Sequence, residues 1–102
     1  MTKPTVRVLE VFLRAPSQEI HGFDLIDKAG VRSGSLYPML ARLEGEGILE
    51  SRWEDSDRPG PRRRLYRFSA DGEPVARKLV SLARQRWPVP PVARKRPQGA
   101  PA

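Results

Sequence analysis

The chain has 102 residues, a formal net charge of +7 at pH 7 and no cysteine. It therefore has room for one small hydrophobic core, and disulfides and thiolate metal sites are excluded. No apolar run approaches the roughly 18 residues that a membrane-spanning helix needs, and no charged and apolar leader opens the sequence. We therefore expect a cytoplasmic protein that neither enters a membrane nor is secreted.

The positive charge is unevenly distributed along the chain. Residues 1–51 carry 6 basic and 7 acidic side chains, whereas residues 52–102 carry 13 basic and 5 acidic ones. Of the 19 basic residues, 15 are arginine, whose planar guanidinium donates paired hydrogen bonds to phosphate and to guanine. This pattern predicts a polyanionic partner, with nucleic acid favoured over an acidic membrane surface.

Two short helices are predicted before residue 31. The first should end near Ala15, because Pro16 disfavours helical backbone in the residue before it. Ile20 is a candidate for a strand of one or two residues. The second helix is predicted from about residue 22 to residue 29, with Gly30 as its C-cap. It is expected to present three apolar side chains to the core, namely Phe23, Leu25 and Ile26.

The next stretch predicts a helix whose two faces differ in chemistry. Ser33 is its expected N-cap, since a hydroxyl can accept hydrogen bonds from the free amides of a first turn. At about 100° per residue, one apolar arc contains Leu36, Met39, Leu40 and Leu43. The opposite arc carries no acidic residue and consists of Gly34, Tyr37, Pro38, Ala41, Arg42 and Gly45. A face without acids is suited to approach phosphate groups.

Two strands with an arginine-rich connection follow this helix. Alternating side chains predict one strand from about residue 49 to residue 55 and another from residue 63 to residue 68. The connecting residues 56–62 are too long and too rich in proline for a two-residue turn. They are better described as a wing, an extended loop that can lie along a DNA groove.

An amphipathic helix is predicted over about residues 70–87. Pro74 falls in its first turn, where a missing amide costs least. Residues 88–102 hold five prolines and the run Arg94-Lys95-Arg96, so we expect them to be disordered. The predicted organisation is one domain over residues 1–87 and a basic tail over residues 88–102.

Several of these segments resemble the PadR-like family of transcriptional regulators. The similar segments are residues 34–44 (GSLYPMLARLE), 47–51 (GILES), 61–68 (PRRRLYRF) and 71–72 (DG), and residues 21–25 (HGFDL) resemble the opening of the family's second helix. The resemblance covers roughly residues 5–85. It implies a winged helix-turn-helix that is mainly α with a small β-hairpin (α+β) and has one C-terminal helix. In function it implies a homodimeric repressor of a palindromic operator.

Together with the resemblance, the predicted helix faces, the N-terminus of the third helix and the wing suggest roles for residues of this chain. Dimerisation through the C-terminal helix is expected to use Val75, Leu79, Leu82, Ala83 and Trp87. Contacts with double-stranded DNA are expected from the third helix, its N-terminus and the wing, through Arg32, Ser33, Ser35, Tyr37, Pro38, Arg42, Arg58, Arg62, Arg63 and Arg64. For Arg42 the alternative is a solvated side chain or a pair with Glu46, and Tyr37 fits either a phosphate contact or packing beneath the wing.

Other functions are weighed against this one. His21 is the only histidine, and the sequence has neither metal-ligand spacing nor a glycine-rich phosphate loop, so no enzyme, metal site or cofactor is expected. A small-molecule effector that stacks on Trp53 or Trp87 is a hypothesis secondary to simple packing of these rings. The alternatives to specific DNA binding are a protein-interaction module and a non-specific architectural DNA binder.

Overall fold

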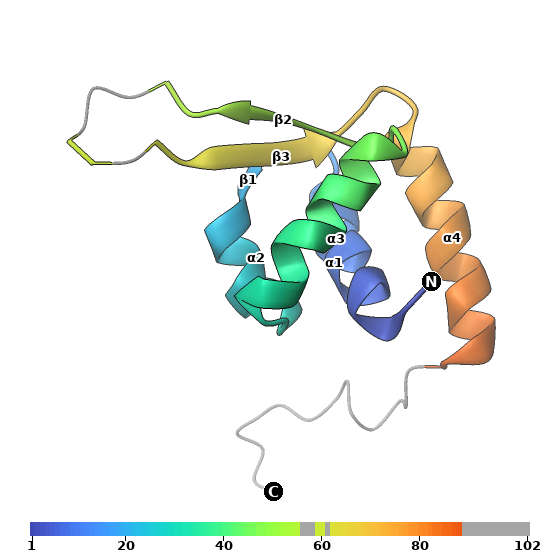
Figure 1. Ribbon diagram of the computed structural model, residues 1–102. Helices are drawn as coiled ribbons and strands as arrows, with labels where there is room; N and C mark the ends of the chain where they lie inside the picture. The colour runs from blue at the N-terminus through green and yellow to red at the C-terminus, as the bar shows by residue number, and fades with distance from the viewer. Residues whose placement is uncertain (56–58, 61, 89–102) are drawn as a thin grey trace, which may run out of the picture.

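The computed structural model describes residues 1–55, 59–60 and 62–88. Across these residues the chain forms four helices and one small antiparallel sheet, so the predicted mainly α fold with a β-hairpin is confirmed. Figure 1 shows the elements, which are α1 (Lys3–Arg14), β1 (Ile20–His21), α2 (Gly22–Ala29), α3 (Ser33–Gly45), β2 (Leu49–Trp53), β3 (Arg64–Phe68) and α4 (Gly72–Arg86). Arg58 of the predicted wing lies outside the described residues. So do residues 89–102, for which the sequence predicts disorder.

The helix ends follow from local sequence, with one correction. The Thr2 side chain caps α1 by accepting the amide of Thr5 at 3.3 Å. Helix α2 ends at Gly30, whose φ of 67° is in the left-handed region that glycine adopts without strain. The prediction that Ser33 caps α3 is wrong. Ser33 is already the first helical residue, so Arg32 is the N-cap. The Arg32 side chain makes no cap hydrogen bond, because a guanidinium has no acceptor.

The core lies between the helices and one face of the sheet. The predicted apolar arc of α3 is confirmed, because all four of its members are buried: Leu36, Met39, Leu40 and Leu43. The prediction that Phe23 faces the core is wrong, since its side chain is 72% exposed. Helix α2 instead buries Gly22, Leu25 and Ala29, a stripe at i, i+3 and i+7 spacing. This stripe leaves Phe23 on the outer side of the helix.

Strand β3 lies between β1 and β2 and runs antiparallel to both. In the β2–β3 hairpin, Leu49 pairs with Phe68, Ser51 with Tyr66 and Trp53 with Arg64. Leu49 and Phe68 join the core, whereas Trp53, at the far end of β2, is 53% exposed. The hairpin therefore begins inside the protein and ends as a projection beyond the helices (Figure 1).

Helix α4 packs against α1 on the side away from α2 (Figure 1). Its start is tight, because a Cβ on Gly72 would lie 2.0 Å from the carbonyl oxygen of Ile48. Ala76 and Ala83 are buried, whereas Val75 and Leu82 are 43% and 53% exposed. Among the described residues, no helix is both long and apolar enough to cross a membrane.

Candidate nucleic-acid interface

The exposed face of α3 is formed by small, polar or basic residues. Glycine, alanine and serine dominate its first and middle turns, and every residue of the predicted outward arc is exposed, namely Gly34, Tyr37, Pro38, Ala41, Arg42 and Gly45. Ser33 and Ser35 are exposed in the first turn. No side chain caps this end. The amide of Ser35 donates to the carbonyl oxygen of Arg32 at 3.0 Å, and the amides of Ser33 and Gly34 remain available to an anion. The face can therefore approach a polyanion closely without meeting a carboxylate.

Four arginines away from this face pair with acids, whereas Arg7, Arg14 and Arg86 make no ion pair among the described residues. Arg67 pairs with Glu50, Arg77 with Glu73 and Arg84 with Glu10. On the outer face of the hairpin, Arg52 donates to both carboxylate oxygens of Glu19 at 2.7 and 2.8 Å. These hydrogen bonds hold the pKa of Glu19 below its ordinary value and raise the pKa of Arg52.

The arginines that flank α3 and the wing have fewer acidic partners. Within the part of the chain that the structure describes, Arg32, Arg42 and Arg62 make no ion pair. All three side chains are exposed. Guanidinium groups without an ion pair therefore lie beside the acid-free face of α3. On the outer face of the hairpin, Arg52 and Arg67 are paired with Glu19 and Glu50.

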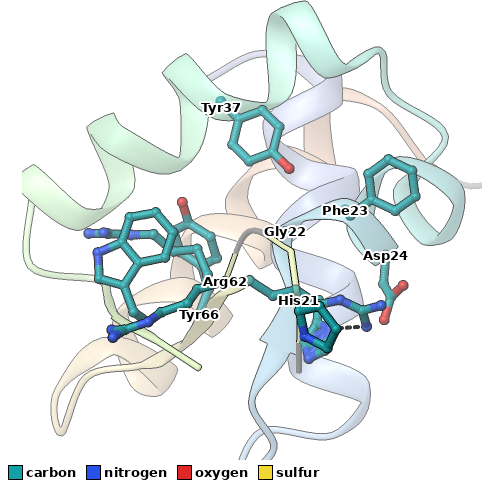
Figure 2. A pocket seen from close by; sticks show the side chains of 11 residues that line it. His21, Gly22, Phe23, Asp24, Tyr37, Arg62 and Tyr66 are labelled. Carbon is teal, nitrogen blue, oxygen red and sulfur yellow. Dashed lines mark hydrogen bonds between the residues drawn. The ribbon is translucent and has the colours of Figure 1, made fainter. Parts of the chain in front are cut away.

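A cleft of about 840 Å³ lies where the start of α2, the first half of α3 and the hairpin meet (Figure 2). Gly22 forms part of its wall. A Cβ at this position would lie 3.0 Å from Cε1 of Tyr37 and 3.2 Å from Cε1 of Tyr66, so glycine allows both rings to approach the backbone. The cleft is lined by aromatic and basic side chains, among them Phe23, Tyr37, Trp53, Tyr66, Arg62, Arg63 and Arg64.

Arg63 is held at the edge of this cleft by the only histidine. Its Nη1 atom donates to Nδ1 of His21 at 3.3 Å, so in this arrangement the imidazole accepts at Nδ1 and carries its proton on Nε2. Nε2 lies 3.7 Å from a carboxylate oxygen of Glu54. Arg63 is exposed, and His21 at the end of β1 orients its guanidinium.

Arg64 has a different environment from its neighbours. Its Nε and Nη2 atoms donate to Oγ of Ser51 at 3.1 and 2.8 Å, and that hydroxyl donates to Glu44 of α3 at 2.8 Å. Beneath it, burial raises the pKa of the Tyr66 phenol above its ordinary value of 10.0. The hydrogen bonds from Arg64 to Ser51 and from Ser51 to Glu44 connect the hairpin with α3.

Residues 8–78 match the family model described as the transcriptional regulator PadR-like family. The chain belongs to this family. PadR-like regulators bind DNA, so this chain is a DNA-binding transcriptional regulator.

Solved structures agree with the PadR-like assignment. A PadR-like transcription factor from Bacteroides fragilis is 26% identical, with a TM-score of 0.63 over 81% of this chain and 84% of that chain. A PadR family regulator from Eggerthella lenta is also 26% identical, with a TM-score of 0.61 over 78% of this chain and 73% of that chain. NadR in complex with 4-hydroxyphenylacetate shares the fold at 21% identity, with a TM-score of 0.64 over 85% of this chain and 58% of that chain. No curated protein matches the chain.

The PadR-like fold brings most of the predicted DNA-contacting residues to one region. Sequence reasoning missed the exposed positions of Phe23 and Trp53 and the internal contacts of Arg64. The buried stripe of α2, with Leu25 and Ala29 four residues apart, was the signal that could have placed Phe23 outside. Among the described residues, no group of three His, Cys, Asp or Glu side chains is placed to hold a metal ion.

Proposed function

We propose that this protein is a homodimeric repressor that reads a palindromic operator in double-stranded DNA with α3 and the wing. The observation that carries the proposal is the acid-free exposed face of α3, flanked by Arg32, Arg42 and Arg62 without acidic partners among the described residues. A winged helix that binds proteins has no physical reason to keep such a face clear of carboxylates. DNA phosphates would be repelled by them.

The residues of this surface take different roles. Arg42 reads a guanine in the major groove through two hydrogen bonds. The hydroxyls of Ser33 and Ser35 and the amides of Ser33 and Gly34 bind a phosphate. Further phosphate contacts come from Arg32, Tyr37, Arg58, Arg62 and Arg63, with Pro38 close to the sugars. Arg64 supports the hairpin through Ser51 and Glu44 and is not itself a phosphate contact.

Dimerisation through α4 is the second part of the proposal. The exposed Val75 and Leu82 form an apolar strip together with the half-buried Leu79, and Trp87 lies at the end of the same helix. Ala83 is buried within one protomer, where its small side chain allows α4 to lie close to α1. A two-fold dimer would place two α3 helices in major grooves about 34–36 Å apart.

A small-molecule effector fits this scheme as a further component, since NadR, which shares the fold, was solved with 4-hydroxyphenylacetate. The scheme requires neither a metal nor an organic cofactor. We propose that the protein acts in the cytoplasm, where it meets the DNA that it regulates.

Fluorescence anisotropy at near-physiological salt tests this function. One labelled duplex carries the DNA upstream of the protein's own gene, and the other is a scrambled duplex of equal composition. A sequence-specific regulator of its own gene should prefer the first by about 10³-fold or more. Equal affinity for both would favour a non-specific architectural binder, and binding to neither would favour a protein-interaction module.

A further inference from the structure

Three aromatic side chains of the described residues are exposed, and all three lie in the same cleft. Phe23 is 72% exposed, Trp53 53% and Tyr37 42%, and each of them lines the cavity between α2, α3 and the hairpin (Figure 2). A single exposed aromatic residue is ordinary, but a gathered set indicates a binding surface. The cleft therefore offers aromatic surface that the folded protein leaves partly uncovered.

Positive charge lies on the hairpin side of these aromatic side chains. Arg62 and Arg63 line the hairpin side of the cleft, and Asp24 is the one carboxylate among the described lining residues. Arg64 lies over the Trp53 ring, 4.8 Å from its centre, and so fixes the ring in the cleft wall. The occupant should therefore combine a flat apolar face with negative charge.

Regular duplex DNA supplies the negative charge but no free apolar face. Its phosphates can meet the arginines, but each base is stacked between its neighbours and has no free face for an aromatic ring. An unpaired nucleotide has both a free base face and a phosphate, and proteins bind such nucleotides with aromatic platforms in positively charged grooves. The cavity volume also lies in the range of roughly 300–1,000 Å³ that is typical of small-ligand sites.

We propose that this cleft is a nucleotide site, which binds one unpaired nucleotide with its base against the exposed aromatic side chains and its phosphate on Arg62 and Arg63. The nucleotide comes either from solution or from a frayed or extruded position of bound DNA. The inference goes beyond the proposed function, and it rests on that function only where the nucleotide belongs to operator DNA.

Tryptophan fluorescence of the full chain tests the site. The Trp87→Phe variant leaves Trp53 as the sole tryptophan, and it is titrated with dTMP, with thymidine, with a single-stranded oligothymidine and with a blunt-ended duplex. Saturable quenching by dTMP indicates a free nucleotide as ligand, whereas quenching by the single strand alone indicates an unpaired nucleotide of DNA. Either result supports the site, and thymidine should bind more weakly than dTMP because it lacks the phosphate.

Two further substitutions make the test decisive. Phe23→Ala, at an exposed position, should weaken binding of the quenching ligand about tenfold or more through the loss of stacking. Arg42→Ala should leave the dTMP titration unchanged but relax base preference on duplex DNA. The two measurements therefore test the nucleotide site and the proposed function independently. The site is refuted if neither dTMP nor the single strand quenches Trp53, or if Phe23→Ala binds them as tightly as the parent.

Discussion

The guanidinium of Arg64 lies 4.8 Å from the centre of the Trp53 ring, and the two residues are direct partners across β2 and β3. The same guanidinium is hydrogen-bonded to Ser51, which is hydrogen-bonded in turn to Glu44 near the end of α3. One side chain thus connects both strands of the hairpin with the helix beside them. These contacts therefore help to fix the hairpin relative to α3.

Replacing Arg64 should show this supporting role. We expect Arg64→Ala to lower the free energy of unfolding by about 1 kcal/mol and to weaken operator binding without changing its dependence on salt. Arg64→Lys keeps the charge but cannot reproduce the paired hydrogen bonds to Ser51, so it should resemble Arg64→Ala. A salt slope reduced by about one unit in Arg64→Ala, but restored in Arg64→Lys, would instead identify a phosphate contact.

Arg63 should behave as a phosphate contact. Its guanidinium is exposed and has a single hydrogen bond to His21 among the described residues. Arg63→Ala should weaken binding to all duplexes alike and reduce the slope of log affinity against log salt by about 0.9. The measurement is a set of anisotropy titrations at several salt concentrations, and equal slopes for variant and parent would contradict the assignment.

Arg42 should instead determine base preference. It lies on the exposed face of α3 without an ion pair among the described residues, free to donate to a base edge. Arg42→Ala should lose about 1–3 kcal/mol of discrimination at one base pair of each half-site. Competition with a library of singly substituted operators measures this loss, and an unchanged preference profile would remove Arg42 from the reading residues.

The parts of the fold that depend on local sequence could be predicted from it. The apolar arc of α3, the left-handed Gly30 and the end of α4 before Pro88 follow from spacing and from the backbone preferences of single residues. The one-residue shift of the α3 N-cap from Ser33 to Arg32 shows the limit of such signals, since neighbouring polar residues compete for the same position.

The orientation of individual side chains in the site could not be predicted in the same way. Phe23 faces outward because the packing of α2 against α1 and α3 buries Leu25 and Ala29 instead. Arg64 is drawn inward by Ser51, a residue 13 positions away on the partner strand. Both outcomes depend on tertiary packing and strand register, which the pattern of a single segment does not contain.

The ion pair between Glu19 and Arg52 predicts a pH-dependent contribution to stability. The pKa of Glu19 is lowered from its ordinary value of 4.5, mainly by its hydrogen bonds to Arg52. The ion pair therefore stabilises the folded state fully above pH 4.5, and this stabilisation is lost as the pH falls through the lowered pKa. Glu19→Gln should reduce the free energy of unfolding in urea at neutral pH and leave it unchanged near pH 2. Glu46→Gln, another exposed carboxylate, is the control and should not alter the difference between the two pH values.

The apolar strip of α4 can be tested with a single charge. Leu82 is 53% exposed in one protomer, so Leu82→Glu should leave the monomer folded, and circular dichroism should be unchanged. A glutamate buried between two α4 helices would lose its hydration without gaining a partner, so sedimentation equilibrium should detect monomers.

Operator affinity should then fall by about 10²-fold or more, because two half-sites are no longer bound together. Ser81→Glu adds the same charge on a neighbouring side of the helix and should remain dimeric, whereas a dimeric Leu82→Glu protein would place the interface elsewhere.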